Sequence, residues 1–205
     1  MSKILLKVDP MPENTRETAN LTSIIEANTH YSKSFSQSEL QPQPTRHISI
    51  LTCMDSRMDP YKFAGLLDGE AHIIRNAGGR ATEDAIRSLI ISHKFLGTLD
   101  WFVIHHTNCG MTLVTEDIIG ELLEDDLETA VIEDGVWINP KRDSTVNTKP
   151  GSAAGKAIDW YTFTDLKESV LKDMSTIRQH ELVPSHINIF GFIFDVKTGK
   201  LTPVN

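Results

Sequence analysis

The only two cysteines of this 205-residue chain each lie in a run of residues that could bind a metal ion. Cys53 begins the run CMDSR (53–57), and Cys109 lies in the run HTNCG (106–110). Two thiolates and an imidazole form a soft set of sulfur and nitrogen ligands, which favours zinc. Three protein ligands leave a fourth position open for water, as in catalytic zinc sites. The two runs therefore predict one catalytic zinc ion per chain.

Asp55 and Arg57 indicate how such a site would be controlled. Zinc lowers the pKa of bound water from about 15.7 to about 7, which makes hydroxide available at neutral pH. Asp55 lies two residues after Cys53, so its carboxylate can accept a hydrogen bond from that water or become a fourth ligand. Arg57 can hold the carboxylate in a bidentate pair. We predict that breaking this pair releases Asp55 to displace the water and close the site.

Two other uses of these residues have less support. In a structural zinc site Asp55 would complete a set of four ligands, but such a site has no need of Arg57. In a thiol redox protein Cys53 and Cys109 would react with each other, but the chain has no C-x-x-C motif. Inert thiols are the ordinary interpretation of buried cysteines, and the polar neighbours argue against it here.

Alternating strand and helix patterns predict the fold that would bring the two runs together. The clearest helix follows Thr82, which is a plausible N-cap, and Gly97 follows its apolar stripe. The alternation indicates an α/β fold with a central, mostly parallel sheet flanked by helices: about four parallel strands and an antiparallel C-terminal strand. The expected strands are residues 46–52, 71–75, 100–105, 187–194 and 201–204, and further helices are expected over 14–39 and 164–180. Ligands collect at the carboxyl ends of parallel strands, which is where both runs begin.

We expect one domain over residues 1–205 with two elaborations. Residues 1–45 form an N-terminal helical arm, which the Pro-containing segment 41–44 ends. Residues 135–157 are rich in Gly, Pro, Ser, Thr and Asn, which predicts a long irregular loop, and such loops are often functional. Aromatic residues in and after this loop are expected to pack it rather than to line a pocket: Trp137, Trp160, Tyr161 and Phe163.

Charge and hydropathy exclude several partners. The formal net charge is −8, and residues 111–140 hold nine Asp or Glu residues and no Lys or Arg. Such a surface would repel nucleic acid and anionic membranes. No apolar run approaches the roughly 20 residues of a transmembrane helix, and the first apolar run is too short for a signal peptide. We therefore expect a cytoplasmic protein.

Three segments resemble the signature segments of β-class carbonic anhydrases: CMDSR (53–57), RNAGG (75–79) and HHTNCGM (105–111). The resemblance covers residues 46–111 and 163–194 and is closest to the small-subunit branch, which also contains carbonyl sulfide hydrolases. The position before the second cysteine is commonly acidic in that branch and is Asn108 here, so the local electrostatics are expected to differ.

The resemblance implies a role for each residue of the two runs. It assigns the zinc to Cys53, His106 and Cys109, with Asp55 as a ligand in some states, and it makes Asp55 and Arg57 the catalytic dyad. It also favours His106 over its neighbour, His105. Adjacent residues of a strand face opposite sides, so one of the two histidines is expected to reach the metal.

The implied activity is hydration of carbon dioxide to bicarbonate by zinc-bound hydroxide. The alternative is a carbonyl sulfide hydrolase that releases hydrogen sulfide and carbon dioxide, because both substrates present a central carbon to the same nucleophile. Asn76, Ala77, Gly78 and Gly79 either form a structural turn or line the substrate pocket. The resemblance further implies a homodimer or homotetramer in which the arm embraces the neighbour and the active site lies near the interface.

Three other polar residues are expected to have structural roles. His93 lies on an apolar helical stripe, so it is interpreted as a hydrogen-bonded core residue rather than a proton shuttle. Arg80 and Arg87 are expected to lie at the surface or in salt bridges.

Overall fold

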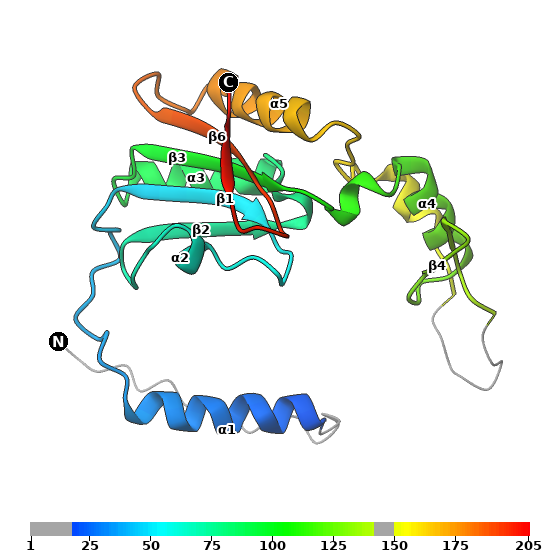
Figure 1. Cartoon of the computed structure of the whole chain (residues 1–205), viewed down its shortest axis with the longest axis horizontal. Coiled ribbons are helices and arrows are strands. Elements are labelled where there is room, and N and C mark those ends of the chain that lie inside the picture. The colour runs from blue at the N-terminus through cyan, green and yellow to red at the C-terminus, as the bar shows by residue number, and fades with distance from the viewer. Residues whose placement is uncertain (1–17, 142–149) are drawn as a thin grey trace. The chain divides into compact units, whose positions relative to one another are not determined.

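A five-stranded sheet lies at the centre of residues 41–205 (Figure 1). The computed structural model describes residues 18–141 and 150–205. The strands follow the order β2-β1-β3-β6-β7. Four are parallel and β7 is antiparallel to β6, so the predicted sheet is confirmed. The strands are β1 (Ile48–Cys53), β2 (Ala71–Asn76), β3 (Asp100–His106), β6 (Asn188–Phe194) and β7 (Leu201–Val204).

The strand order reverses direction at β1. The chain passes from β1 to β2 on one side, and then returns across β1 to β3 on the other side. In open α/β sheets, such a switch point leaves a crevice at the carboxyl ends of the strands. β1 ends at Cys53 and the adjacent strand β3 ends at His106. The topology therefore places both cysteine-containing runs at this crevice.

Two apolar cores cover the two faces of the sheet. Leu51 of β1 packs in one core with Leu89 of α3 (Glu83–Lys94) and Ile177 of α5 (Leu166–Gln179). The neighbouring Ile50 packs in the other core, which includes Phe63 of the short helix α2 (Pro60–Phe63). This alternation follows from the two-residue period of a strand. The second core also holds both cysteines.

The helices beside the sheet begin at side-chain caps. Thr82 accepts a hydrogen bond from the Ala85 N–H at the start of α3, as predicted, and Gly97 follows that helix with φ +73°. Asp165 caps α5 in the same way. His93 lies in the last turn of α3, where its Nδ1 donates to the Thr98 carbonyl oxygen at 2.7 Å. This bond agrees with the interpretation of His93 as a structural residue.

The prediction of an irregular loop over residues 135–157 was wrong at both of its ends. Val136–Ile138 form β5, which pairs with β4 (Val131–Glu133) in an antiparallel hairpin. The two turn residues, Asp134 and Gly135, have φ values of 50° and 80°. Positive φ at both positions is the type I′ turn that Asp-Gly favours. The prediction followed the Gly and Pro content of the whole segment. It therefore missed the Asp-Gly turn and the Val-Trp-Ile run, which is typical of a β-strand.

The other end of the expected loop is the 3-10 helix η3 (Ala153–Ala157), which packs on α4 (Glu116–Asp125). A Cβ on Gly155 would lie 2.9 Å from Leu123 Cδ1, so a larger residue there would force the Leu123 side chain to shift. Lys156 also pairs with Glu124 of α4. Residues 142–149, the middle of the expected loop, lie outside the described residues.

The chain separates into two units, Met1–Leu40 and Gln41–Asn205. The single domain over residues 1–205 and its arm over residues 1–45 stay predictions. Within the first unit, α1 covers Ala19–Lys33 and begins at the N-cap Thr18. It is shorter than the predicted helix over 14–39, and residues 14–17 of that prediction lie outside the described residues. No residue of α1 is buried. None of the described helices is long and apolar enough to cross a bilayer.

Candidate metal centre

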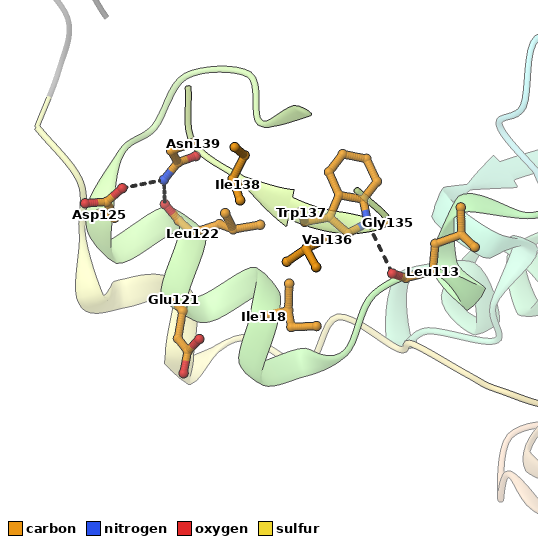
Figure 2. A pocket seen from close by; sticks show the side chains of 10 residues that line it. All are labelled: Leu113, Ile118, Glu121, Leu122, Asp125, Gly135, Val136, Trp137, Ile138 and Asn139. Atoms are coloured by element: carbon orange, nitrogen blue, oxygen red, sulfur yellow. Dashed lines mark hydrogen bonds between the residues drawn. The ribbon is translucent and has the colours of Figure 1, made fainter. Parts of the chain in front are cut away.

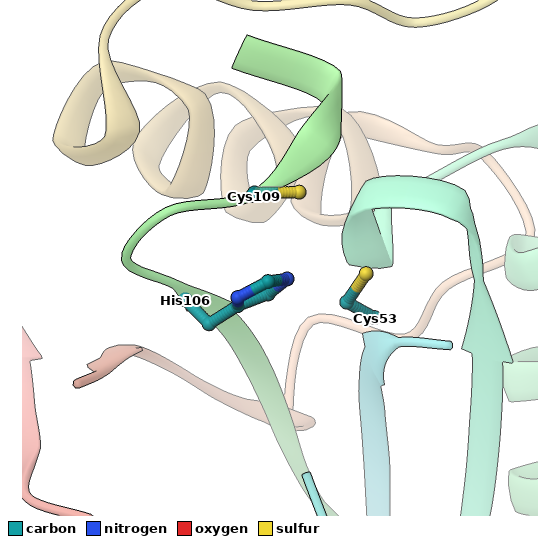
Figure 3. A group of neighbouring side chains, drawn as sticks. All are labelled: Cys53, His106 and Cys109. Carbon is teal, nitrogen blue, oxygen red and sulfur yellow. The ribbon is translucent and has the colours of Figure 1, made fainter. Parts of the chain in front are cut away.

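Three buried side chains converge at the crevice (Figure 3). The sulfurs of Cys53 and Cys109 and a ring nitrogen of His106 all lie within 4.8 Å of one another. Cys53 and His106 end the adjacent strands β1 and β3. Asn108 then takes a left-handed conformation, φ +55°, which turns the chain so that Cys109 follows at the start of the 3-10 helix η2 (Gly110–Thr112). Three donors at this spacing can share one metal ion.

The ring of His106 is oriented for a ligand at its Nε2 atom. Its Nδ1 donates to the Thr107 carbonyl oxygen at 3.0 Å, because a carbonyl can only accept. The neutral ring then carries a lone pair on Nε2, which is buried and makes no hydrogen bond to any described residue. An unpaired buried acceptor is costly, and a metal ion would satisfy it. Neutral imidazole with its second nitrogen fixed in this way is the usual form of a metal-binding histidine.

His105 does not reach this cluster. Its ring is completely buried, and its Nε2 lies 3.2 Å from an oxygen of Asp173 in α5. The structure therefore brings His106, and not His105, to the two sulfurs, as the alternation of side chains along β3 requires.

The two thiols differ strongly in acidity. A hydrogen bond from Cys109 is the main cause that lowers the pKa of Cys53 to about 4, and the neighbouring His106 ring and the backbone N–H groups of Asp55 and Gly78 lower it further. The same contact raises the pKa of Cys109, and burial raises it further. The hydrogen bond between the two sulfurs therefore favours the thiolate of Cys53 and disfavours that of Cys109. A divalent cation would stabilise both thiolates, so the donor set fits zinc.

Arg57 holds the Asp55 carboxylate beside this cluster. Its Nε lies 2.9 Å from Asp55 Oδ1 and its Nη2 lies 2.6 Å from Oδ2, which is the bidentate pair expected from the sequence. Arg57 lowers the pKa of Asp55 to about 2 through these hydrogen bonds. Its Nη2 also donates to the Asn108 carbonyl oxygen at 3.0 Å. Asp55 Oδ2 lies 3.8 Å from His106 Nε2, so a small rotation would bring the carboxylate to a metal.

The predicted turn at residues 76–79 packs directly against Cys53. Asn76 closes the turn: its Oδ1 accepts from the Arg80 N–H and its Nδ2 donates to the Arg80 carbonyl. Gly79 has φ +71°, and a Cβ there would lie 2.8 Å from the Cys53 nitrogen. Ala77 begins this 3-10 turn, η1 (Ala77–Gly79). The turn therefore packs against one of the three candidate metal ligands. The role of its residues in a substrate pocket stays a prediction.

Sequence comparison finds the family profile described as carbonic anhydrase over residues 48–201. The chain is also 38% identical to β-carbonic anhydrase 1 of Mycobacterium tuberculosis over 177 residues, which are 86% of this chain and 93% of that protein. The chain belongs to the β-carbonic anhydrase family.

A solved structure and a further relative are also similar to this chain. The carbonic anhydrase from Streptococcus mutans is 37% identical, with a TM-score of 0.75 over 92% of this chain and 99% of the other. A carbon disulfide hydrolase of Acidithiobacillus thiooxidans is 34% identical over 160 residues, or 77% of each chain. Relatives named for two different activities are therefore similar to this chain over most of its length.

Arg80 is buried, and its role was only partly expected. It is 3% exposed, and its Nε lies 2.8 Å from Asp173 Oδ2. Asp173 follows Val170 by three residues and precedes Ile177 by four, so it lies on the apolar stripe of α5. A carboxylate on an apolar stripe is a signal that could have identified this pair. Arg87 forms the expected surface salt bridge, with Asp84.

A cavity of about 490 Å³ lies away from the metal cluster, between α4 and the β4–β5 hairpin (Figure 2). Ile118 and Leu122 of α4 face Val136 and Ile138 across it. Trp137 also lines it and donates to the Leu113 carbonyl oxygen at 3.1 Å, so the expectation that Trp137 would not line a pocket was wrong. None of the predicted zinc ligands lines this cavity.

Proposed function

We propose that this protein hydrates carbon dioxide to bicarbonate at one zinc ion held by Cys53, His106 and Cys109. Family membership supports the reaction, and the convergence of three buried donors supports the ligand set. Bound zinc would acidify a coordinated water and so supply the nucleophile for the carbon of the substrate. The observation that carries the proposal is the unpaired Nε2 of His106, aimed at the two sulfurs.

The chain's own residues would orient and regulate this site. Arg57 keeps the Asp55 carboxylate ionised and bound on both oxygens. In that position Asp55 can accept a hydrogen bond from a water beside His106 without displacing it. The backbone N–H groups that point to the cysteine sulfurs, from Asp55 and Gly78 to Cys53 and from Met111 to Cys109, stabilise thiolates. Because all three donors are buried, a metal held by them would be shielded from bulk water.

Metal content and turnover, measured together, test the ligand set. We expect one zinc per chain by elemental mass spectrometry and rapid hydration of carbon dioxide by stopped flow. Cys53→Ala and His106→Ala should each lose metal and turnover. His186→Ala, an exposed histidine outside the cluster, is the matched control and should keep both. A Cys53→Ala protein that retained both metal and turnover would overturn the assignment.

Hydrolysis of a sulfur-containing analogue is the second candidate function. The sequence resemblance suggested carbonyl sulfide, and the 34% identity to a carbon disulfide hydrolase favours testing carbon disulfide beside it. All three substrates are small and linear with a central electrophilic carbon. Release of hydrogen sulfide should be measured on the same preparation as hydration of carbon dioxide. A kcat/KM for either sulfur compound above that for carbon dioxide would reverse the order of the two candidates.

We also propose that the protein is a homodimer or homotetramer in which α1 packs on a neighbouring copy. The helix has 15 residues, and none is buried within its own chain. Isolated helices of this length are marginal in water. Apolar side chains nevertheless project from it, with Ile24 68% and Tyr31 53% exposed. A second copy of the chain would cover them. The cytoplasmic location expected from the sequence stays a prediction.

A further inference from the structure

Asp173 is a buried carboxylate that the proposed reaction does not use. It lies on α5, is 3% exposed, and accepts four hydrogen bonds. Arg80 Nε and Nη2 donate to its two oxygens at 2.8 and 3.0 Å, the Ala81 N–H donates at 3.2 Å, and His105 Nε2 donates at 3.2 Å. One side chain of α5 is thus bonded to two segments that lead to the metal cluster.

The first connection runs through His105 to β3. His105 precedes the ligand His106, and their side chains lie on opposite sides of the strand. The hydrogen bond from His105 to Asp173 holds the C-terminal end of β3 against α5. Phe163 also packs on the His105 ring, with ring centres 5.5 Å apart. The orientation of this part of β3 decides where the His106 ring points.

The second connection runs through Arg80 to the turn that contacts Cys53. The backbone of Arg80 is bonded to the Asn76 side chain, which closes the turn around Gly78 and Gly79. The Gly78 N–H donates to the Cys53 sulfur, and Gly79 packs on the Cys53 backbone. A displacement of Arg80 would therefore move a hydrogen-bond donor away from a metal ligand.

We propose that Asp173 is a positioning residue for the metal centre, acting on His106 through His105 and on Cys53 through Arg80. The proposal rests on the ligand set proposed above. Stability alone does not account for the pair, because apolar residues of similar volume often stabilise a fold as well as a buried ion pair does. Partners beyond the ligands fix ligand orientation, and their loss typically weakens metal binding by roughly 10- to 100-fold.

Zinc competition against a chelator tests this role in the full-length protein. Asp173→Asn should bind zinc about 10-fold or more weakly, because asparagine cannot hold both Arg80 and His105 as a carboxylate does. The cobalt-substituted variant should show shifted absorption bands, which report the geometry of the two thiolates and the imidazole. The gain in melting temperature when zinc is added to metal-free protein should also be smaller than in the unaltered chain, because weaker binding stabilises less.

Ile177→Val is the matched control, because Ile177 lies one turn further along the same buried stripe of α5. It should lower the melting temperatures of the metal-free and zinc-loaded proteins equally and leave zinc affinity within twofold. If Asp173→Asn does not fold, the double variant Arg80→Met with Asp173→Leu replaces the ion pair by apolar groups and tests the same prediction.

Two results would overturn the proposal: zinc affinity within twofold of the unaltered chain in a folded variant, or unchanged cobalt bands. Failure of the ligand assignment would appear separately, as a Cys53→Ala protein that retains its zinc and turnover.

Discussion

Arg57 and Gly79 each make a close contact beside the candidate ligand Cys53. Arg57 occupies both oxygens of Asp55, two residues after the cysteine. The backbone of Gly79 lies against that of Cys53. A Cβ on Gly79 would lie 2.8 Å from the Cys53 nitrogen, so no side chain fits there. Arg57 is expected to decide whether water or Asp55 occupies the fourth coordination position of the metal. Gly79 is expected to keep the Cys53 sulfur in place. Two substitutions separate these effects.

Arg57→Ala removes the bidentate partner of Asp55. The freed carboxylate should move to the metal, and kcat/KM for carbon dioxide should fall by about 10- to 100-fold. X-ray absorption at the zinc edge should then show a fourth protein ligand in place of water. Arg57→Lys keeps the charge but cannot form the bidentate pair, so an intermediate loss is expected. A coordinated water still present in Arg57→Ala would count against this mechanism.

Gly79→Ala should destabilise the protein by about 2–4 kcal/mol, because it adds a clash with the Cys53 backbone to the strain of positive φ. Gly199→Ala is the control, since Gly199 has the same φ of +71° but no atom within 4 Å of an added Cβ. It should cost about 1 kcal/mol. Urea unfolding of the zinc-loaded proteins measures both changes, and equal costs would show that the contact with Cys53 is unimportant.

The start of α4 connects the segment after the metal cluster to the segment before α5. Glu116, in the first turn of α4, accepts from the N–H groups of Trp160 and Thr162 at 2.7 and 3.1 Å. The next residue, Phe163, donates its N–H to the Met111 carbonyl oxygen at 3.3 Å. Burial acts to raise the pKa of the Glu116 carboxyl, but these hydrogen bonds outweigh it, so the pKa lies below its usual value. The ionised carboxylate is therefore part of the fold.

Glu116→Gln should lower the free energy of unfolding by about 1 kcal/mol at pH 7. The sign of its pH dependence follows from the lowered pKa: the stabilisation is present above about pH 4.5, the usual value for this carboxyl, and is lost as the pH falls through the folded-state pKa. The difference between the two proteins should thus shrink toward pH 3 in urea unfolding. Glu121→Gln, on the same helix, is the control and should stay within about 0.5 kcal/mol. A difference that grows in acid would contradict the assignment.

The proposed assembly of the whole molecule depends on α1. This helix has no residue that is buried within its own chain. Leu21, Ile24 and Ile25 follow a spacing of three to four residues, which places them on one side of the helix. The proposed neighbour would bury this stripe. Its burial would offset the cost of ordering a helix that is otherwise marginal.

Replacing Ile24 and Ile25 together by Glu should therefore dissociate the oligomer. Light scattering after size-exclusion chromatography is expected to give a dimer or tetramer for the unaltered chain and a smaller species for the variant. Ser23→Glu adds one charge beside the apolar stripe, at another exposed position of α1, and should leave the mass unchanged. An unaltered chain that elutes as a monomer would exclude the proposed assembly.

The types of the metal donors, four parallel strands and the cap of α3 could all be predicted from the sequence, because each depends on residues close together in the chain. The Asp-Gly hairpin was equally local, yet the overall composition of residues 135–157 concealed it. The family resemblance already favoured His106 over His105, and the structure places His106 at the cluster. Only the tertiary structure paired Arg80 with Asp173, 93 residues away. Local patterns fix which side of a strand or helix a residue faces. The pairing of distant residues depends on how the elements pack, and no short stretch of sequence contains that information.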